Sequence, residues 1–432
     1  MPNTPTPKAQ NLPKAPAHEQ KSPAIKATAK TSTTQATTAK APTTQAPFTQ
    51  ATPIKYTPAF PHFPPQEIDW ILQEIRAMLE GEKMLSMSGA VREFESAFAK
   101  YCHRAHGIIT NSCTSALDLV LRHVCKDRSD EVIIPTQTFF ANLSSIIHAN
   151  ATPICCDTDE NFLLDFEDLK HRITSRTKAI VLVHFAGAIT PHIFAIKELC
   201  QKWGITLIED CSHAHGAYAI DAQGHKHMAG SLGDFACFSF FSTKIMTMGE
   251  GGIILCDREQ DSLTLRALAN RGLNPLAKAE EFIHYGENFR LTELQATLGL
   301  SQLRCLEDFL AHRNHIASIY KEELKGLESA LRFQEVSEGF RHAYWRFLIF
   351  LKAHDAAHIR ALLAESNIIA DAPYNPLLHK QPLFNAPPPS GICPQASALC
   401  TTHISLPIHQ RIQPDDARFI AATLKQLLQE QK

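Results

Sequence analysis

The chain has 432 residues, of which 44% are hydrophobic and 20% charged, and its formal net charge is −2. A chain of this size can form one large core and a smaller one, and its near-neutral charge gives no reason to expect a nucleic acid as partner. The 12 cysteines have neither C-x-x-C nor zinc-site spacing, so we expect reduced thiols in a cytoplasmic protein.

Residues 1–58 are rich in Pro, Ala, Thr, Lys and Gln and contain almost no large apolar residue. Because this composition cannot offset the entropy of an ordered chain, we expect a disordered tail. Its lysines outnumber its single acid, Glu19, so it is either a soluble tail or a tether to an acidic partner. The N-terminus lacks the apolar core of a secretory signal, and no apolar run of the chain is long enough to span a membrane.

From residue 65 onward the pattern changes, and helical spacing of apolar residues appears over 67–79 and 89–101. Short apolar runs then alternate with amphipathic segments. The expected strands are 107–110, 132–135, 152–156, 179–185, 206–209, 235–240 and 252–255, and the expected helices are 114–124, 141–149, 166–173 and 193–203. The alternation predicts an α/β fold with a doubly wound, mostly parallel sheet in a large domain over residues 59–310. Ligands of such sheets lie beyond the carboxyl ends of the strands.

A long helical stretch begins at Thr292 and runs towards Leu327, long enough to connect two domains. The segments 342–351, 356–366 and 414–428 predict a smaller α+β domain within residues 311–432. The Pro-rich segment 374–394 is expected to be a loop that returns to the active site.

Lys244 lies between the apolar runs 235–240 and 252–255. We expect two buried strands joined by a tight, Gly-bearing turn that holds this lysine. An ammonium is costly to bury unless it is paired or neutralised, and desolvation lowers the pKa of a lysine and makes it a nucleophile towards carbonyl groups. The alternative is a solvated turn lysine, since most single charges lie at the surface.

Further polar residues are expected at the same edge of the sheet. Residues 111–115 (NSCTS) follow a strand and open a helix, where backbone N–H groups and hydroxyls suit a phosphate or form an ordinary cap. Asp210 ends a buried strand and must have a partner there. With His213 and His215 it could also suggest a metal site, but histidines two residues apart point differently and no further ligand is evident, so we expect no metal.

These features have one economical explanation, the cofactor pyridoxal 5′-phosphate (PLP). The cofactor needs a lysine, a carboxylate for its pyridine nitrogen and a phosphate cup. It also favours an aromatic ring against its face, and Phe139 ends another strand on the same side. The alternative for Phe139 is packing in the core.

Four blocks of sequence carry a resemblance to a known family: 210–217 (DCSHAHGA), 233–244 (GDFACFSFFSTK), 249–252 (GEGG) and 288–296 (NFRLTELQA). With these blocks the chain resembles, from about residue 65 to its end, the DegT/DnrJ/EryC1/StrS family, whose typical members are sugar-nucleotide aminotransferases. The resemblance implies the fold type I of PLP-dependent enzymes, similar to aspartate aminotransferase, and a homodimer with shared active sites.

The resemblance also implies roles for residues around the cofactor ring. Lys244 would be the Schiff-base lysine, and Asp210 would pair with the pyridine nitrogen. His213 would lie near the 3-hydroxyl, and Phe139 would stack on the ring.

For the phosphate, the resemblance implies Cys113, Thr114 and Ser239 as ligands, with Asn288 reaching across the dimer interface. The segment 374–379 resembles the family pattern Tyr-x-Pro-Leu-His but has one extra residue before His379. A contact of His379 with substrate is therefore not assigned.

The implied activity is that of a transaminase of class EC 2.6.1, which moves an amino group from an amino acid, with glutamate as the first choice, to a keto sugar. A nucleotide-linked 4-keto or 3-keto sugar is the family's commonest substrate, for surface polysaccharide or secondary-metabolite biosynthesis. A keto-cyclitol, a keto-octulosonate, and a non-catalytic PLP-fold sensor or scaffold are the alternatives. A dehydratase branch of the family has histidine at this position, so Lys244 argues against a dehydratase. A nicotinamide-dependent reductase would need a Gly-x-Gly-x-x-Gly motif after the first strand, and no such motif follows that strand here.

Overall fold

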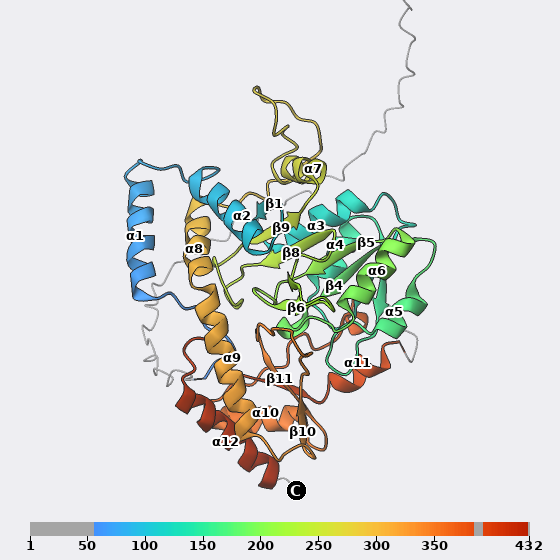
Figure 1. Cartoon of the computed structure of the whole chain (residues 1–432), viewed down its shortest axis with the longest axis vertical. Coiled ribbons are helices and arrows are strands. Elements are labelled where there is room, and N and C mark those ends of the chain that lie inside the picture. Colours follow the sequence, from blue (N-terminus) through green and yellow to red (C-terminus); the bar gives the residue numbers. More distant parts are fainter. Residues whose placement is uncertain (1–55, 384–391, 431–432) are drawn as a thin grey trace, which may run out of the picture. The chain divides into compact units, whose positions relative to one another are not determined.

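The structure is a computed structural model that describes residues 56–383 and 392–430 (Figure 1). The tail predicted over residues 1–58 lies almost wholly outside the described residues, and the domain boundaries at residues 58 and 310 stay predictions. Within the described ranges no helix combines the length and the apolar character that crossing a membrane requires.

A seven-stranded sheet organises the larger part of the structure, with the strand order β1-β9-β8-β5-β4-β2-β3 (Figure 1). Strands β8, β5, β4, β2 and β3 are parallel neighbours, whereas β9 runs antiparallel to both β8 and β1. The predicted mixed, mostly parallel sheet is therefore confirmed. Its strands are β1 (His106–Thr110), β2 (Glu131–Pro135), β3 (Thr152–Cys156), β4 (Thr177–Val183), β5 (Thr206–Asp210), β8 (Phe235–Ser239) and β9 (Gly252–Cys256).

Both faces of this sheet are covered, which explains why its strands are continuous apolar runs. Along β4, Ile180 and Leu182 belong to one apolar cluster, and Val181 and Val183 belong to the cluster on the other face. Figure 1 shows the helices that flank the sheet. They are α2 (Gly89–Tyr101), α3 (Cys113–Val124), α4 (Ala141–His148), α5 (Phe166–Arg172), α6 (Ile193–Trp203) and α7 (Glu259–Ala269). Helix α1 (Pro65–Leu79) lies farther from the sheet and packs on the helix Glu293–Arg304.

The helices predicted in this part are all present, with ends shifted by at most two residues. Helix α7 and the small hairpin of β6 (Tyr218–Ile220) and β7 (Lys226–Met228) were not predicted. The first turn of α7 carries Glu259 and Asp261, so its sequence lacks a clear apolar stripe.

The C-terminal part of the chain forms a second, three-stranded antiparallel sheet in the order β10-β11-β12. The helical stretch that was predicted as one run from Thr292 is divided at Cys305 into two helices, the first packed on α2 and the second on the last helix of the chain. These elements are α8 (Glu293–Arg304), α9 (Leu306–Glu323), β10 (Leu331–Phe333), β11 (Phe347–Leu351), α10 (Ala356–Glu365), α11 (Pro394–Leu399), β12 (His403–Leu406) and α12 (Pro414–Glu430).

The tight turn predicted between β8 and β9 is wrong, because residues 240–251 separate the two strands. The intervening loop is held by an isolated bridge between Phe241 and Gly249 and by Thr247, whose Oγ1 donates to the carbonyl oxygen of Phe240 at 3.1 Å. Glycine signals mark the end of a connection but not its length. The longer loop gives Lys244 room to leave the plane of the sheet.

A fully buried ion pair lies against one face of the sheet. Glu209 of β5 accepts a hydrogen bond from Nε2 of His184 at 2.8 Å. It also accepts from the backbone N–H groups of Gly230, Leu232 and Gly233, at 2.9, 2.8 and 2.6 Å. Burial pushes the pKa of Glu209 upward, but the hydrogen bond and charge of His184 and the backbone N–H groups outweigh it and leave that pKa below its usual value. Glu209 therefore fixes the segment that leads into β8.

We predict that Glu209→Gln lowers the free energy of unfolding by about 3–5 kcal/mol near neutral pH, because it removes one partner of a buried pair. Since the folded pKa of Glu209 is lowered, its contribution is present above the unfolded pKa of about 4.3 and is lost as the pH falls through that of the folded state. Urea unfolding at neutral and at acid pH measures both effects. The difference between wild type and variant should shrink in acid, and Glu198→Gln, at an exposed residue of α6, is the matched control.

Candidate active site

A cavity of about 470 Å³ lies beyond the carboxyl ends of β5 and β8, where a ligand of such a sheet is expected. Residues from the β8–β9 loop, the first turn of α3 and the segment before β11 line it together. Of the eight predicted site residues, the structure brings seven into this one cavity: Cys113, Thr114, Phe139, Asp210, His213, Ser239 and Lys244.

Lys244 reaches the cavity from the loop 240–251, and its Nζ lies 4.5 Å from the ring centroid of Trp345. Among the described residues Nζ has no hydrogen-bond or ion-pair partner, so the amine is held by a cation–π contact alone. Burial lowers the pKa of Lys244 to about 8, with Asp210 and Cys113 opposing the shift and Arg346 adding to it. The half-buried lysine therefore differs from a solvated turn lysine, and its role as a reactive amine stays a prediction.

Asp210 is the last residue of β5, and both of its carboxylate oxygens are held. Oδ2 accepts from Nδ2 of Asn142 at 2.8 Å, and Oδ1 accepts from the backbone N–H of Ser212 at 3.0 Å. Nδ2 of Asn142 also donates to Oγ1 of Thr138 at 2.8 Å, which fixes the amide. In the part of the chain that the structure describes, no cation pairs with Asp210. An oriented carboxylate without a cation suits a protonated ring nitrogen of a ligand.

His213 belongs to a stack of rings at the wall of the cavity. Its imidazole lies parallel to the indole of Trp345, with ring centroids 3.7 Å apart and planes inclined by 4°. Nε2 is 2.9 Å from the hydroxyl oxygen of Tyr374, and Nδ1 is buried without a partner among the described residues. Burial, and then the charges of Lys244 and Arg346, hold the pKa of His213 well below its usual value, so the ring is neutral. Its orphaned Nδ1 leaves a place for a polar ligand atom.

The first turn of α3 forms the floor on the other side. Ser112 is the N-cap, and its Oγ accepts from the backbone N–H of Ser115 at 3.1 Å. The backbone N–H groups that follow have no intrahelical partner and attract anions. A Cβ on Gly252 of β9 would lie 2.4 Å from the carbonyl group of Ser112, so only glycine lets the strand approach the helix so closely. With Thr114 and Ser239 beside it, this turn fits a phosphate group.

Phe139, Asn288 and the unassigned His379 differ from the other residues in their placement. Phe139 lies at the rim with 53% of its surface exposed, and its ring centroid is 5.7 Å from that of Tyr374. Asn288 is exposed and does not line the cavity of its own chain. His379 is buried outside the cavity, with Nδ1 2.5 Å from Oγ1 of Thr136. A direct contact of His379 with a ligand in this cavity is therefore not supported.

The sequence interpretation missed Trp345, Arg346, Tyr374 and Asn142 as site residues. The first two precede β11 and looked like part of a strand, whereas Tyr374 belongs to the Pro-rich loop that was expected to return to the site. The expectation that the Pro-rich loop returns to the site could have identified Tyr374. The contacts of the other three join segments that are far apart in the chain.

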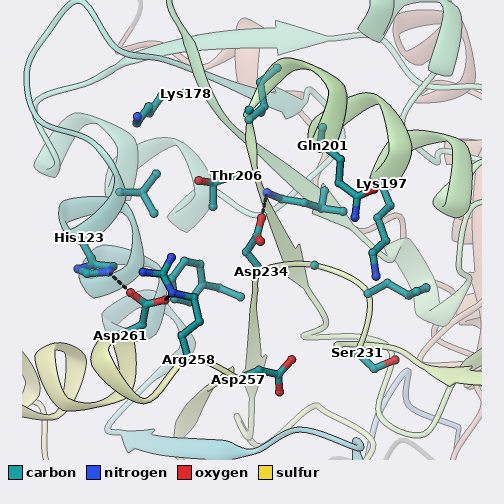
Figure 2. Close-up of a pocket in the computed structure, with 18 of the residues that line it drawn as sticks. His123, Lys178, Lys197, Gln201, Thr206, Ser231, Asp234, Asp257, Arg258 and Asp261 are labelled. Carbon is teal, nitrogen blue, oxygen red and sulfur yellow. Dashed lines mark hydrogen bonds and ion pairs between the residues drawn. The ribbon is translucent and has the colours of Figure 1, made fainter.

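A larger cavity of about 650 Å³ lies at the opposite edge of the same strands, where β5 and β8 begin (Figure 2). Its acids already have partners: Asp261 contacts Nε2 of His123 at 2.9 Å, and Asp257 pairs with Nε of Arg104 at 3.2 Å. Asp234 accepts from the backbone N–H of Leu207 at 2.8 Å. Figure 2 shows the Asp261 and Asp234 contacts as dashed lines. The acids of this larger cavity already have partners, and its lining contains no buried reactive amine. The cavity that contains Lys244 is therefore the candidate active site.

Comparison with known proteins agrees with this geometry. The model of the DegT/DnrJ/EryC1/StrS aminotransferase family matches residues 65–425. The GDP-perosamine synthase of Caulobacter vibrioides is 32% identical over 375 residues, which cover 86% of this chain and 97% of that protein. A UDP-N-acetyl-3-dehydro-alpha-D-glucosamine 3-aminotransferase of Acidithiobacillus ferrooxidans is 35% identical over 375 residues, or 85% and 96% of the two chains.

Among solved structures, DesV of S. venezuelae superposes with a TM-score of 0.77 at 26% identity, covering 86% of this chain and 99% of DesV. The likeness confirms the fold type I architecture that the sequence predicted, and the family match confirms the resemblance.

We predict that the Lys244 amine of the cofactor-free protein reacts with an acylating reagent with a midpoint near pH 8, below that of a free lysine at about 10.4. Asp210→Asn should move the midpoint lower, because the carboxylate charge favours the ammonium form. Peptide mapping by mass spectrometry after timed labelling measures both midpoints, with the side-chain amine of Nα-acetyl-lysine as the reference. A midpoint equal to that reference would contradict the buried amine described above.

Proposed function

Since the chain belongs to the DegT/DnrJ/EryC1/StrS aminotransferase family, we propose that it transfers an amino group from an amino acid to a nucleotide-linked keto sugar. As a member of the family the chain is a PLP-dependent transaminase. The observation that carries the proposal is the cavity that joins the free, low-pKa amine of Lys244 with the oriented carboxylate of Asp210.

The donor groups of the cavity fit PLP. Asp210 would hold a protonated pyridine nitrogen, and the orphaned Nδ1 of His213 would meet the 3-hydroxyl. The first amides of α3, with Thr114 and Ser239, would bind the phosphate. Phe139 at the rim would cover one face of the ring. When bound, PLP supplies a carbonyl carbon for amine exchange and a ring that disperses the electrons released at the substrate carbon.

Lys244 has two tasks in this proposal. Its Nζ would hold the cofactor until the donor amine takes its place, and it would then be free in the cavity. With a pKa of about 8, a sizeable share of the amine is neutral near physiological pH. It can therefore take up the proton that leaves the α-carbon of the donor and give it back as a general acid. The Trp345 ring would keep the amine close to the reacting atoms.

The acceptor class follows from the relatives. One is named a GDP-perosamine synthase and another a 3-aminotransferase of a UDP-linked sugar, so a nucleotide-linked 4-keto or 3-keto sugar is the first choice for this chain. Glutamate is the proposed donor, and the amino sugar formed would serve surface polysaccharide or secondary-metabolite biosynthesis. We place the enzyme in the cytoplasm, because all twelve of its cysteines are unpaired.

We further propose a homodimer whose subunits share their active sites. Asn288 lies outside the cavity of its own chain, so a phosphate contact through it has to come from a second copy. The segment between α7 and α8 extends away from the sheet in Figure 1 and exposes four large apolar side chains: Leu276, Phe282, Ile283 and Tyr285. An apolar patch of this kind supports an interface.

We predict that Lys244→Ala lowers transamination at least about a hundredfold, because it removes the group that exchanges with the donor amine and moves the proton. A screen of nucleotide-linked keto sugars and keto-cyclitols with glutamate as donor, read as product formation, measures turnover. Lys202→Ala, at an exposed residue of α6, is the matched control and should keep the wild-type rate. Full activity of Lys244→Ala would refute the proposed chemistry.

The shared site can be tested by mixing two inactive variants, Lys244→Ala and Asn288→Asp, where the new carboxylate repels the phosphate. In mixed dimers one site then combines an intact Lys244 with an intact Asn288. We predict recovery of about a quarter of wild-type activity after equal subunits are exchanged. If Asn288 acts within its own chain, no mixed dimer contains a complete site and activity stays absent.

A further inference from the structure

The hairpin of β6 and β7 carries three side chains that can bind a metal ion. Its register pairs Ala219 with His227, and the pair that closes the turn is Asp221 with His225. Because side chains alternate along a strand, the aspartate and the two histidines project from the same face of the hairpin, where the small Ala219 leaves room beside them. None of these residues lines the cavity that contains Lys244.

The three polar side chains converge on one atom, Oδ2 of Asp221. Nε2 of His227 lies 2.9 Å and Nδ1 of His225 lies 3.2 Å from this oxygen. The other carboxylate oxygen, Oδ1, accepts from the backbone N–H groups of Gln223 and His225 at 2.9 and 2.8 Å. Carboxylates that bind a metal are usually held by hydrogen bonds of this kind, which fix the direction of the oxygen that meets the ion.

The electrostatics of the hairpin keep the carboxylate available as a ligand. The hydrogen bond with His227, and after it the backbone N–H groups of the turn, hold the pKa of Asp221 well below its usual range, so the group is ionised near neutral pH. Lys226 belongs to the opposite face of the hairpin, and its Nζ lies 5.2 Å from the centroid of the Tyr218 ring. Within the described residues no lysine or arginine pairs with Asp221.

The two histidines differ in how firmly they are held. The ring of His227 packs edge-on against Phe194 of α6, with centroids 5.4 Å apart and planes inclined by 71°. The side chain of His225, by contrast, is 74% exposed. A zinc ion needs its ligand atoms about 2.0–2.2 Å away, on several sides of one point. The exposed ring of His225 can turn towards such a point, while Asp221 and His227 provide the fixed part of the site.

Another set of potential ligands, His184, Glu209 and Cys211, is less suited to a metal ion. All three side chains are fully buried, and Glu209 already accepts hydrogen bonds from His184 and from three backbone N–H groups. Burial also raises the pKa of the Cys211 thiol well above its usual value, so the thiol keeps the proton that a metal ligand has to lose.

We propose that Asp221, His225 and His227 bind a divalent transition-metal ion, with Zn²⁺ as the first choice and water completing its coordination. Imidazole and carboxylate groups are ordinary ligands of zinc. Because all three ligands belong to one hairpin, the ion would clamp β6 to β7 at the turn. The hairpin connects β5 to β8, so the ion would stabilise the link between two strands that border the catalytic cavity. This site does not depend on the proposed transaminase function.

Zinc binding to the full-length, PLP-loaded protein, measured by competition with a chromophoric chelator, tests the proposal. Both His225→Ala and Asp221→Asn should weaken zinc binding at least about tenfold, because each removes a ligand. Zinc should raise the Tm of the wild type, as a ligand of the folded state does, and the rise should be smaller in His225→Ala. Since His225 is exposed, this variant should keep the wild-type Tm when no zinc is added.

Diethyl pyrocarbonate, which acylates imidazole nitrogens, shows where the ion binds. Peptide mapping should find that zinc protects His225 and His227 from the reagent, whereas His358, an exposed histidine of α10, stays reactive. His358→Ala is the matched control and should keep the wild-type affinity for zinc. Equal zinc affinity of His225→Ala and wild type overturns the inference, as does labelling of His225 that zinc does not change, because either result assigns the bound zinc to other residues.

Discussion

The contact between the Lys244 amine and the Trp345 ring is the interaction on which the site depends. Burial lowers the pKa of this amine, and the charge of Asp210 opposes the shift only in part. The indole holds the amine in place through a cation–π contact. The two partners come from different sheets, since Lys244 follows β8 and Trp345 precedes β11. The reactive lysine is therefore a product of the packing of the two sheets and not of its own loop alone.

The same indole also orders the rest of the wall. Its Nε1 donates to the backbone oxygen of Thr243 at 2.9 Å, which ties the ring to the residue before Lys244. The imidazole of His213 stacks on the plane of this indole, and its Nε2 lies within hydrogen-bond distance of the Tyr374 hydroxyl. A neutral histidine in this place adds no charge that would compete with Lys244 for Asp210. One aromatic side chain thus contacts the Lys244 amine, the His213 ring and the loop that carries Lys244.

The sequence predicted those parts of the structure that depend on neighbouring residues. Apolar runs and helical spacing located the strands and most helices, and the ends of the strands pointed to Asp210 and Lys244. Trp345 and Tyr374 could not be found in this way, because their roles arise from contacts with residues about a hundred or more positions away in the chain. The connection between β8 and β9 was predicted too short for a related reason, since turn residues do not encode how far a loop must reach. The position of Asn288 outside its own cavity likewise has no local signal.

The end of β5 shows how closely structural and chemical roles can adjoin. Glu209 and Asp210 are consecutive in an extended strand, so their side chains point to opposite faces of the sheet. On one face Glu209 accepts hydrogen bonds from His184 and from three backbone N–H groups, and these bonds fix the segment that leads into β8. On the other face Asp210 is held by an amide and a backbone N–H, and no cation within the described part of the chain pairs with it. A shift of β5 by one residue would exchange these environments and place the saturated acid in the cavity. The register of a single buried strand therefore decides which of two neighbouring acids is available for chemistry.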